Sequence, residues 1–231
     1  TSSGFTTTGA SILTEIQSLP KGILFWRSFT HWIGGMGVLV FMLSILPLAG
    51  GNNMHILRAE SPGPSVGKLV PRLRSTATIL YAIYAALTFI EFVLLLLGGM
   101  SLFDAVTTAF ATAGTGGFGI KNSSMAEYSV YIQNVVAIFM VLFGVNFAIY
   151  FLFLIKKPKE ALKSEELRTY LGIIFISTIV IGFNIKDSFS SIWVALQQAF
   201  FQVGSIITTT GFSTVDFNTW PALSKTIIVI L

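Results

Sequence analysis

Uninterrupted apolar runs constrain this chain more than any other feature of its sequence. Three of them are long: Ile23 to Leu48, Ser75 to Leu97 and Tyr131 to Ile155. A helix that spans a membrane needs about 20 largely apolar residues, and all three runs reach that length. Charged residues make up only 10% of the chain, whereas a soluble domain carries roughly 25%. We therefore expect an integral membrane protein.

Two clusters of basic residues lie in the connections between these runs. They comprise Arg58, Lys68, Arg72 and Arg74 in the first connection, and Lys156, Lys157, Lys159, Lys163 and Arg168 after the third run. Short loops rich in Lys and Arg mark the cytoplasmic side of a membrane, so both clusters are predicted to be cytoplasmic. They border membrane spans and lack interleaved aromatic residues, which argues against a nucleic-acid partner.

The segment between the second and third runs is too apolar for an exposed outer loop. Two cytoplasmic clusters require Ser75–Leu97 to leave the cytoplasm and Tyr131–Ile155 to return, which places residues 100–119 outside. Residues 102–110 have a helical pattern with Asp104 in the first turn, where a carboxylate suits the positive end of the helix dipole. About a dozen residues cover roughly half of a bilayer. We predict a re-entrant helix that enters the membrane and returns through a loop.

The same pattern occurs three times. The middle copy ends in Gly-Thr-Gly-Gly at Gly117, and a third copy follows the shorter apolar run Tyr170–Phe183 and ends in Thr-Thr-Thr-Gly at Gly211. The first residues of the chain end another copy, Thr-Thr-Thr-Gly at Gly9, before the run Ile23–Leu48. Repeats of this kind indicate a pseudosymmetric assembly of membrane helix, half-helix, loop and returning helix.

Threonine and glycine at these points suit a dehydrated cation. Irregular backbone at membrane depth is tolerated only where it is buried or lines a water-filled cavity, and rings of backbone carbonyls replace the hydration shell of potassium in filters. Glycine permits positive φ angles and leaves room for carbonyls to converge. The candidate ion ligands are Thr7, Thr8, Gly9, Thr115, Gly116, Gly117, Thr209, Thr210 and Gly211.

A single loop of this kind is weak evidence, because threonine and glycine are ordinary in turns. Three copies at equivalent places favour the filter interpretation over plain turns. The loops have no ring of acidic residues beside them, so selectivity by charge alone is not expected. The chain has no Cys and two His, which excludes a thiolate site and argues against a histidine-based metal site. It has no phosphate loop or catalytic set, so an enzyme is not expected.

A few polar residues within the apolar runs have more than one interpretation. Arg27 is expected to extend to the interface or to pair with a carboxylate, Glu15 being the candidate. Glu91 and Asn146 lie in spans, where an acid is a functional suspect and a structural role is an equal alternative. The Gly-Gly pair at Gly34 and Gly35 is predicted to be a close-packing contact.

The run from Leu24 to Gly37, Leu-Phe-Trp-Arg-Ser-Phe-Thr-His-Trp-Ile-Gly-Gly-Met-Gly, follows the Thr-Thr-Thr-Gly-Ala around Gly9. Together with the loops it resembles the TrkH/KtrB family of bacterial potassium-uptake subunits, most closely the TrkH branch, over essentially the whole chain. The resemblance implies an all-α polytopic membrane protein. It has repeated helix–pore-loop–helix units around a central pore, with about two and a half of four units present.

The resemblance also implies how the chain divides. Residues 1–57 would be the end of unit one, with its filter loop and inner helix, and residues 58–74 a cytoplasmic linker. Residues 75–155 would be unit two, with outer helix, pore helix, filter and inner helix, and 156–168 a second cytoplasmic linker. Residues 169–231 would be unit three up to the start of its inner helix. We accordingly expect an interior piece of a longer protein.

In function, the resemblance implies potassium uptake across the plasma membrane through a carbonyl-lined selectivity filter. The residues just before each glycine would supply the ion-facing carbonyls, with the loops on the extracytoplasmic side. No covalent cofactor is implied, and K⁺ is the transported ion. The implied partners are a second copy in a homodimer, the lipid membrane and a cytoplasmic nucleotide-binding regulatory subunit of the TrkA/KtrA type. Two alternatives remain: a Na⁺- or H⁺-coupled symporter with a second ion site at Glu91 or Asn146, and a non-conducting scaffold.

Overall fold

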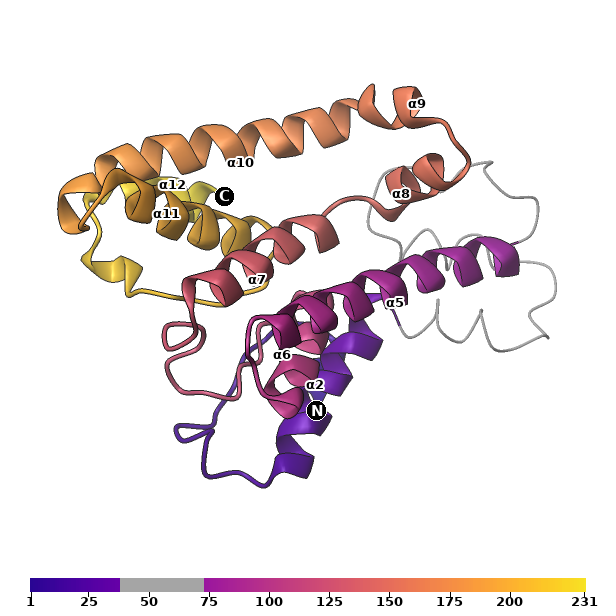
Figure 1. Cartoon of the computed structure of the whole chain (residues 1–231), viewed down its shortest axis with the longest axis horizontal. Helices are drawn as coiled ribbons and strands as arrows, with labels where there is room; N and C mark the ends of the chain where they lie inside the picture. Colours follow the sequence, from indigo (N-terminus) through magenta and orange to yellow (C-terminus); the bar gives the residue numbers. More distant parts are fainter. Residues whose placement is uncertain (38–72) are drawn as a thin grey trace.

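The structure, a computed structural model, describes residues 1–37 and 73–231. All the regular elements in these ranges are helices (Figure 1). The elements are α1 Ser2–Phe5, α2 Lys21–Gly35, α5 Leu73–Leu97, α6 Leu102–Ala113, α7 Val130–Phe143, α8 Phe147–Leu154, α9 Pro158–Leu162, α10 Glu165–Asn184, η1 Lys186–Ser188, α11 Ile192–Ile207, η2 Phe217–Thr219 and α12 Ala222–Ile230. The later part of the run Ile23–Leu48 and the basic residues Arg58, Lys68 and Arg72 lie outside the described residues.

Serine caps begin four of these helices. The side chains of Ser101, Ser129, Ser164 and Ser191 accept hydrogen bonds from the backbone N–H groups of Asp104, Ile132, Leu167 and Val194, respectively. A helix leaves its first amides without internal partners, and a serine side chain at this position satisfies one of them. The sequence therefore fixes where α6, α7, α10 and α11 start.

Two helices within the described ranges are long and apolar enough to cross a membrane: α5, over Ala77–Leu97, and α10. The short helix expected over residues 102–110 is confirmed and extends to Ala113 as α6. The half-helix of the third copy is α11, which starts at Ile192 because Ser191 caps it there. At 12 and 16 residues, α6 and α11 are shorter than a full span.

The run Tyr131–Ile155, expected as a span, is bent in the structure. Helices α7 and α8 share this run but meet at 89° across a break at Gly144–Asn146. Gly144 ends α7, and the side chain of Asn146 accepts a hydrogen bond from the N–H of Ala148, which starts a new helix. Apolar composition alone does not reveal the bend, because both halves are strongly apolar.

Two tyrosine hydroxyls donate to backbone carbonyls at this break. Tyr150 donates to the carbonyl oxygen of Leu142 at 2.6 Å, and Tyr170 on α10 donates to that of Val141 at 3.0 Å. Unpaired carbonyls are costly at membrane depth, so these bonds stabilise the bent arrangement.

The re-entrant helices occupy equivalent places in the fold. Helix α6 packs against α2 and α5, and helix α11 packs against α7 and α10. Each therefore lies between the outer helix of its own repeat and the returning helix of the repeat before it. Close contact at the end of α2 is confirmed, since a Cβ atom at Gly35 would lie 2.6 Å from the Cα of Gly114 and one at Gly34 would overlap the carbonyl oxygen of Phe5.

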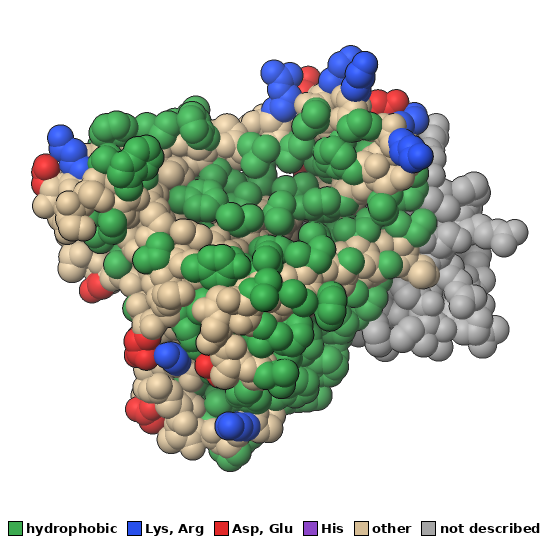
Figure 2. All heavy atoms as spheres, viewed as in Figure 1, with side chains coloured by type: hydrophobic (Ala, Val, Ile, Leu, Met, Phe, Trp, Pro, Cys, Tyr) green, Lys and Arg blue, Asp and Glu red, His purple; other side chains and the backbone are tan. Residues whose placement is uncertain are grey.

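The surface has a broad apolar belt with charge at its rims (Figure 2). Large apolar side chains are exposed on the long helices, among them Phe89, Phe175 and Trp193. Basic side chains gather at the end of the molecule where α9 lies, and another set of charges lies at the opposite end, toward the loops. An exposed apolar surface of this extent fits a lipid environment.

Candidate functional site

The three threonine- and glycine-bearing loops have the same backbone. In each, the residue after the helix C-cap has a positive φ: 52° at Thr7, 48° at Thr115 and 57° at Thr209. The glycine two positions later also has a positive φ, at Gly9, Gly117 and Gly211. Positive φ is a genuine outlier for a β-branched residue, and it persists only where the surroundings hold it.

The amides of these loops fold back onto the helix that precedes them. In the middle loop, the N–H of Thr115 donates to the carbonyl of Thr112 and the N–H of Gly116 to that of Ala111, at 2.9 and 3.2 Å. The equivalent bonds join Thr7 to Gly4 and Thr8 to Ser3 in the first loop, and Thr209 to Ile206 and Thr210 to Ser205 in the third. This is the pattern of a helix C-terminal motif, in which loop amides satisfy the last carbonyls of the helix.

The carbonyls of the two residues before each glycine accept no hydrogen bond from any described residue. Two of these residues, Gly116 and Thr210, are buried, and because buried backbone carbonyls are normally paired, these two need a partner from outside the backbone. A dehydrated cation is such a partner.

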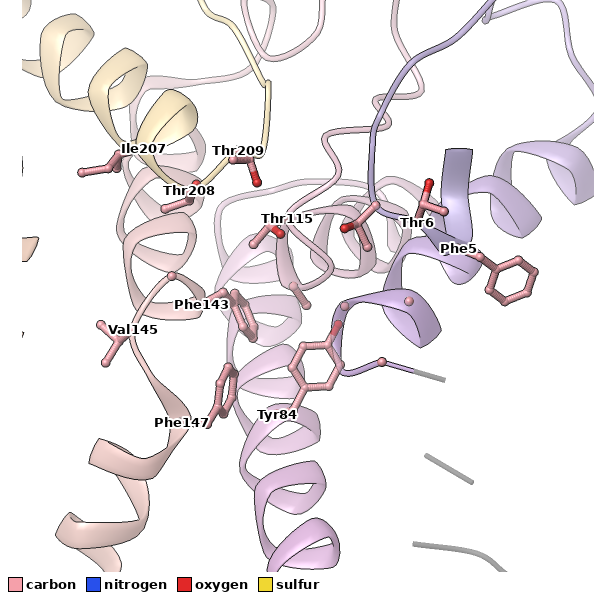
Figure 3. A pocket seen from close by; sticks show the side chains of 16 residues that line it. Phe5, Thr6, Tyr84, Thr115, Phe143, Val145, Phe147, Ile207, Thr208 and Thr209 are labelled. Atoms are coloured by element: carbon pink, nitrogen blue, oxygen red, sulfur yellow. The ribbon is translucent and has the colours of Figure 1, made fainter. Parts of the chain in front are cut away.

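The loops meet at one cavity of about 650 Å³. Figure 3 shows threonines of all three loops at one end of it, with Tyr84, Phe143 and Phe147 at the other. Of the nine predicted ligands, Thr7, Thr115 and Thr209 line the cavity and the other six do not. The aromatic end was not predicted, and the only sequence signal for it is Gly144, the break residue, which also lines the cavity.

The loops also touch one another through their backbones. A Cβ atom at Gly9 would overlap the carbonyl oxygen of Gly116, and one at Gly117 would overlap that of Thr210. At Gly211 no described atom lies within 4 Å of the same position. In each contact, the glycine of one loop lies against the residue that precedes the glycine of the next loop, an arrangement we call head-to-tail. A side chain at Gly9 or Gly117 would overlap that residue, so only glycine fits at these two positions.

The cavity lining contains no ionisable acid or base among the described residues, apart from the phenol of Tyr84. The described residues also hold no group of three or more His, Cys, Asp and Glu side chains that would bind a metal ion. Helices α6 and α11 end at the cavity, and the negative end of a helix dipole favours a cation. The site offers oxygen ligands from backbone and hydroxyl groups rather than carboxylates.

Threonine hydroxyls brace two of the loops. Thr6 and Thr8 share a hydrogen bond of 2.8 Å, and Thr208 and Thr210 share another of 2.8 Å. In the third loop the hydroxyl of Ser205 also donates to the carbonyl of Phe212 at 2.6 Å. The middle loop has Gly114 and Gly116 at the two braced positions and so has no such pair.

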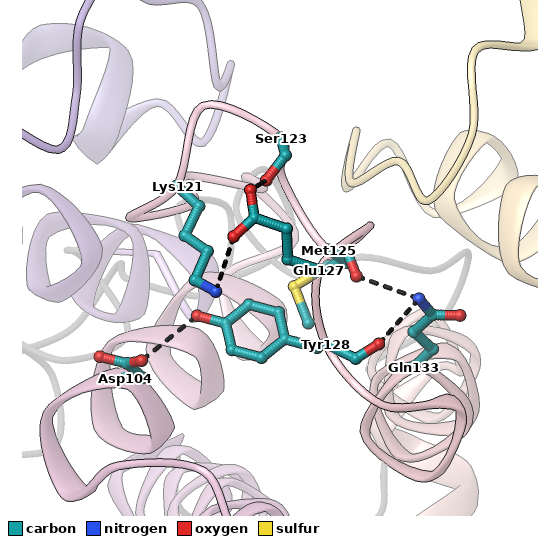
Figure 4. Close-up of polar contacts among 7 residues, drawn as sticks. All are labelled: Asp104, Lys121, Ser123, Met125, Glu127, Tyr128 and Gln133. Carbon is teal, nitrogen blue, oxygen red and sulfur yellow. Dashed lines mark hydrogen bonds and ion pairs between the residues drawn. The ribbon is translucent and has the colours of Figure 1, made fainter.

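A polar cluster holds the outer segment that follows the middle loop (Figure 4). Glu127 accepts hydrogen bonds from Ser123 at 2.6 Å and from Lys121 at 3.0 Å, which hold the pKa of its exposed carboxyl below the usual range. Burial raises the pKa of Tyr128, and the nearby carboxylate of Asp104, which accepts its hydrogen bond, raises it further.

This outer segment is also bound to the third loop. The N–H of Met125 donates to the carbonyl of Ser213 at 2.9 Å, and the N–H of Ser213 donates to the hydroxyl of Ser124 at 3.1 Å. Gln133 on α7 donates to the carbonyls of Met125 and Tyr128, both at 3.1 Å. The exits of the second and third loops are therefore fixed to each other.

The expected pairing of Arg27 with Glu15 is wrong. The guanidinium of Arg27 lies 4.3 Å from the ring centroid of Phe118, a cation–π contact, while Glu15 accepts a hydrogen bond from Asn122 at 2.8 Å. Neither polar residue of the symporter alternative lines the cavity. Glu91 is fully buried in α5, and Asn146 donates to the carboxylate of Glu166 at 3.2 Å.

Comparison with protein families gives one match over the whole chain. The model of the TrkH family, described as a cation transport protein, matches residues 1–231. Among curated proteins, the Trk system potassium uptake protein TrkH of Escherichia coli (strain K12) is 39% identical over 226 residues, which cover 95% of this chain and 46% of that protein. The Trk system potassium uptake protein TrkG of the same strain is 34% identical over 233 residues, 99% of this chain and 48% of that protein.

A solved structure is similar in fold as well. The crystal structure of the potassium transporter TrkH from Vibrio parahaemolyticus matches with a TM-score of 0.81 at 33% identity. The match covers 99% of this chain and 47% of that one. The chain spans about half the length of the relatives that it matches.

Proposed function

The chain belongs to the TrkH family of cation transport proteins, and we propose that its three loops form part of a potassium-selective filter in a membrane uptake system. It is a membrane protein with an all-helical fold. The observation that carries the proposal is that one residue of each strained turn, Thr7, Thr115 and Thr209, lines a single cavity, with a backbone carbonyl that accepts no hydrogen bond from the described residues. The transported ion is K⁺, as in the names of the relatives, and no covalent cofactor takes part.

The oxygen atoms divide into two groups in this proposal. The carbonyls of Thr7, Thr8, Thr115, Gly116, Thr209 and Thr210 replace the hydration shell of the ion. The threonine hydroxyls and the aromatic side chains of Tyr84, Phe143 and Phe147 line the wider cavity next to the filter. A partly hydrated ion binds there, stabilised by the negative ends of the helix dipoles. The glycines Gly9, Gly117 and Gly211 allow the backbone to turn with a positive φ and are not themselves the main ion ligands.

The units are proposed to divide as 1–57, 75–155 and 169–231, joined by cytoplasmic linkers at 58–74 and 156–168. The loops then lie on the extracytoplasmic side of the plasma membrane. The separation of the loop end from the basic end around α9 supports this orientation. A head-to-tail set of loops with an open face at Gly211 fits a ring of four units.

The proposed assembly has a second copy of the chain and a cytoplasmic nucleotide-binding regulatory subunit of the TrkA/KtrA type. The Trk system named in the relatives is the support for this part of the proposal. A channel-like pathway is preferred over a coupled symporter, because Glu91 and Asn146 both lie away from the cavity lining. A non-conducting scaffold gives no reason for the same strained turn in three loops.

The test is a substitution at Gly117 in the intact protein, in cells that lack other potassium uptake. Gly117→Ala places a methyl group against the carbonyl of Thr210 on a backbone with a φ of 66°. We expect rubidium uptake or its selectivity over sodium to fall by about 5- to 150-fold, the factor that corresponds to a strain of about 1–3 kcal/mol.

The matched control is Gly172→Ala, because Gly172 lies in α10 and a Cβ atom there would meet no described atom within 4 Å. This variant is expected to transport normally. Unchanged uptake and selectivity in Gly117→Ala, at a normal amount of protein in the membrane, would show that the loop is no filter.

A further inference from the structure

The middle loop differs from the other two where they are braced. The first and third loops carry a hydrogen-bonded pair of threonine hydroxyls, at Thr6 with Thr8 and at Thr208 with Thr210. The middle loop has glycine at both equivalent positions, Gly114 and Gly116. Its backbone is nevertheless the same, with a positive φ at Thr115 and at Gly117. Another group must hold it in place.

The side chain of His31 occupies the space beside this loop. A Cβ atom at Gly116 would overlap Cε1 and Nε2 of the His31 ring and lie 2.5 Å from its Nδ1. The imidazole therefore fills the volume that a threonine side chain at Gly116 would need. His31 belongs to α2, the returning helix of the preceding repeat, and its exposed fraction is 0%.

The ring is itself held in place by its neighbours. It stacks on Phe118, the residue after the filter glycine, with centroids 4.0 Å apart and an angle of 23° between the planes. The guanidinium of Arg27, one helical turn earlier on α2, lies 4.3 Å from the same Phe118 ring. The imidazole thus lies between the backbone of Gly116 and the aromatic ring of Phe118.

The imidazole ring of His31 contacts the middle loop by packing and not by hydrogen bonds. Neither Nδ1 nor Nε2 of His31 has a hydrogen-bond partner among the described residues. A close-packed interior leaves few voids, so removing a buried ring leaves a cavity into which the neighbouring backbone relaxes only in part. The backbone next to this ring includes the carbonyl group of Gly116.

We propose that His31 is a positioning residue for the middle filter loop, whose ring replaces the threonine brace of the other two loops and sets the position of the Gly116 carbonyl. The inference rests on the proposed filter function. It makes the returning helix of one unit part of the selectivity device of the next. It also accounts for Gly-Thr-Gly-Gly in the middle loop, where the other two have Thr-Thr-Thr-Gly.

The test is a double-mutant cycle on the intact protein, with rubidium uptake and selectivity over sodium as readouts. His31→Ala empties the space behind Gly116, and Gly116→Ala overfills it. Gly116 has no positive φ, so the His31 ring is the obstacle to an alanine there. Each single variant is expected to lose selectivity about tenfold, whereas the double variant recovers to within about threefold of the unmodified protein.

Gly114→Ala provides the matched control on the same loop. A Cβ atom at Gly114 would overlap the backbone carbonyl of His31 and lie 2.9 Å from its Cβ, atoms that alanine at position 31 retains. His31→Ala is therefore expected not to rescue Gly114→Ala. His31→Phe keeps a ring but no ring nitrogen, and it is expected to keep most of the selectivity.

Several outcomes would overturn the proposal. It fails if His31→Ala keeps full selectivity, if Gly116→Ala is not rescued by His31→Ala while both proteins reach the membrane normally, or if His31→Phe behaves like His31→Ala. Gly117→Ala separates this failure from a failure of the filter function. Loss of selectivity in Gly117→Ala without coupling between His31 and Gly116 rejects only the role of His31, whereas normal transport in Gly117→Ala rejects the filter itself.

Discussion

At the scale of single residues, the threonines with positive φ are the strongest sign of a functional constraint. Thr7, Thr115 and Thr209 adopt a backbone conformation that costs a β-branched residue about 1–3 kcal/mol. Glycine would adopt it without cost, yet the sequence keeps threonine in all three loops. All three residues line the cavity, which is where a strained conformation is expected at a functional site.

The exposed carboxyl of Glu127 gives a pH dependence at the same scale. Its pKa is lowered in the folded protein by Ser123 and Lys121, so the folded state binds fewer protons than the unfolded one. The resulting stabilisation of the outer segment is present above about pH 4.5, the ordinary value for the group, and is lost as the pH falls through the lowered value. We expect amide hydrogen exchange over residues 121–128 to speed up, relative to the rest of the protein, below that pH.

Glu127→Gln should remove most of this acid sensitivity. Glu160→Gln, at an exposed ion pair with Lys157 near α9, is the control and should leave exchange over residues 121–128 unchanged. Equal acid sensitivity in Glu127→Gln and in the unmodified protein would assign the effect to another group.

At the scale of elements, the break between α7 and α8 is held by specific hydrogen bonds. Asn146 caps the second helix, and the hydroxyls of Tyr150 and Tyr170 donate to carbonyls of Leu142 and Val141 in the last turn of the first. Tyr170 lies on α10, so the outer helix of the third repeat holds the bend in the inner helix of the second. The break lines the cavity through Gly144 and Val145, which ties its shape to that of the pathway.

Removing one of these hydroxyls should destabilise the bend. Tyr170→Phe leaves the carbonyl of Val141 without its partner, and a buried unpaired acceptor costs about 1–3 kcal/mol. A cost of that size lowers the melting temperature of the purified protein in detergent by roughly 2 °C or more. Tyr131→Phe on α7 is the control, because that tyrosine is exposed, and it should melt as the unmodified protein does. Equal melting of the two variants would contradict the role given to Tyr170.

At the scale of the whole molecule, the segment between α6 and α7 and the basic end around α9 lie at opposite ends of an apolar belt. Ile12, between the first loop and α2, is 99% exposed, in a stretch that is hydrogen-bonded to that segment through Ile16 and Asn122. Lys159 on α9 is exposed at the basic rim. The two positions should therefore face opposite sides of the membrane.

Cysteine labelling tests this orientation, because the chain itself has no cysteine. With any cysteines elsewhere in the protein replaced by serine, a membrane-impermeant maleimide should label Ile12→Cys in intact cells. Lys159→Cys should be labelled only after the cells are permeabilised. Labelling of Lys159→Cys from outside would reverse the proposed topology.

Most of the architecture could be predicted from apolar runs, basic clusters and the repeated Thr/Gly loops. These signals are local, which is why the short helix expected over residues 102–110 agrees with the structure. The bend at Gly144–Asn146 could not be predicted, because the tyrosine that holds it, Tyr170, comes from another helix. The partner of Arg27 was likewise hidden, since Phe118 lies in a different repeat and a search by opposite charge selects Glu15 instead.

The same limit applied to the candidate site. Composition and spacing identified the three loops, but their contact with one another depends on tertiary packing. The glycines of the middle loop gave a visible difference from Thr-Thr-Thr-Gly, yet the reason for it lies in the ring of His31, far away in the sequence.

The head-to-tail contact of the loops makes the propagation of damage unequal in the two directions. A side chain added at Gly9 pushes on the carbonyl of Gly116, and one added at Gly117 pushes on that of Thr210. The described contacts provide no matching push in the reverse direction. A side chain at either of these glycines therefore damages two loops at once, its own and the next one, whereas a Cβ atom at Gly211 would meet no described atom within 4 Å. Equivalent glycines of the three pseudosymmetric loops are for this reason not equivalent in mutational consequence.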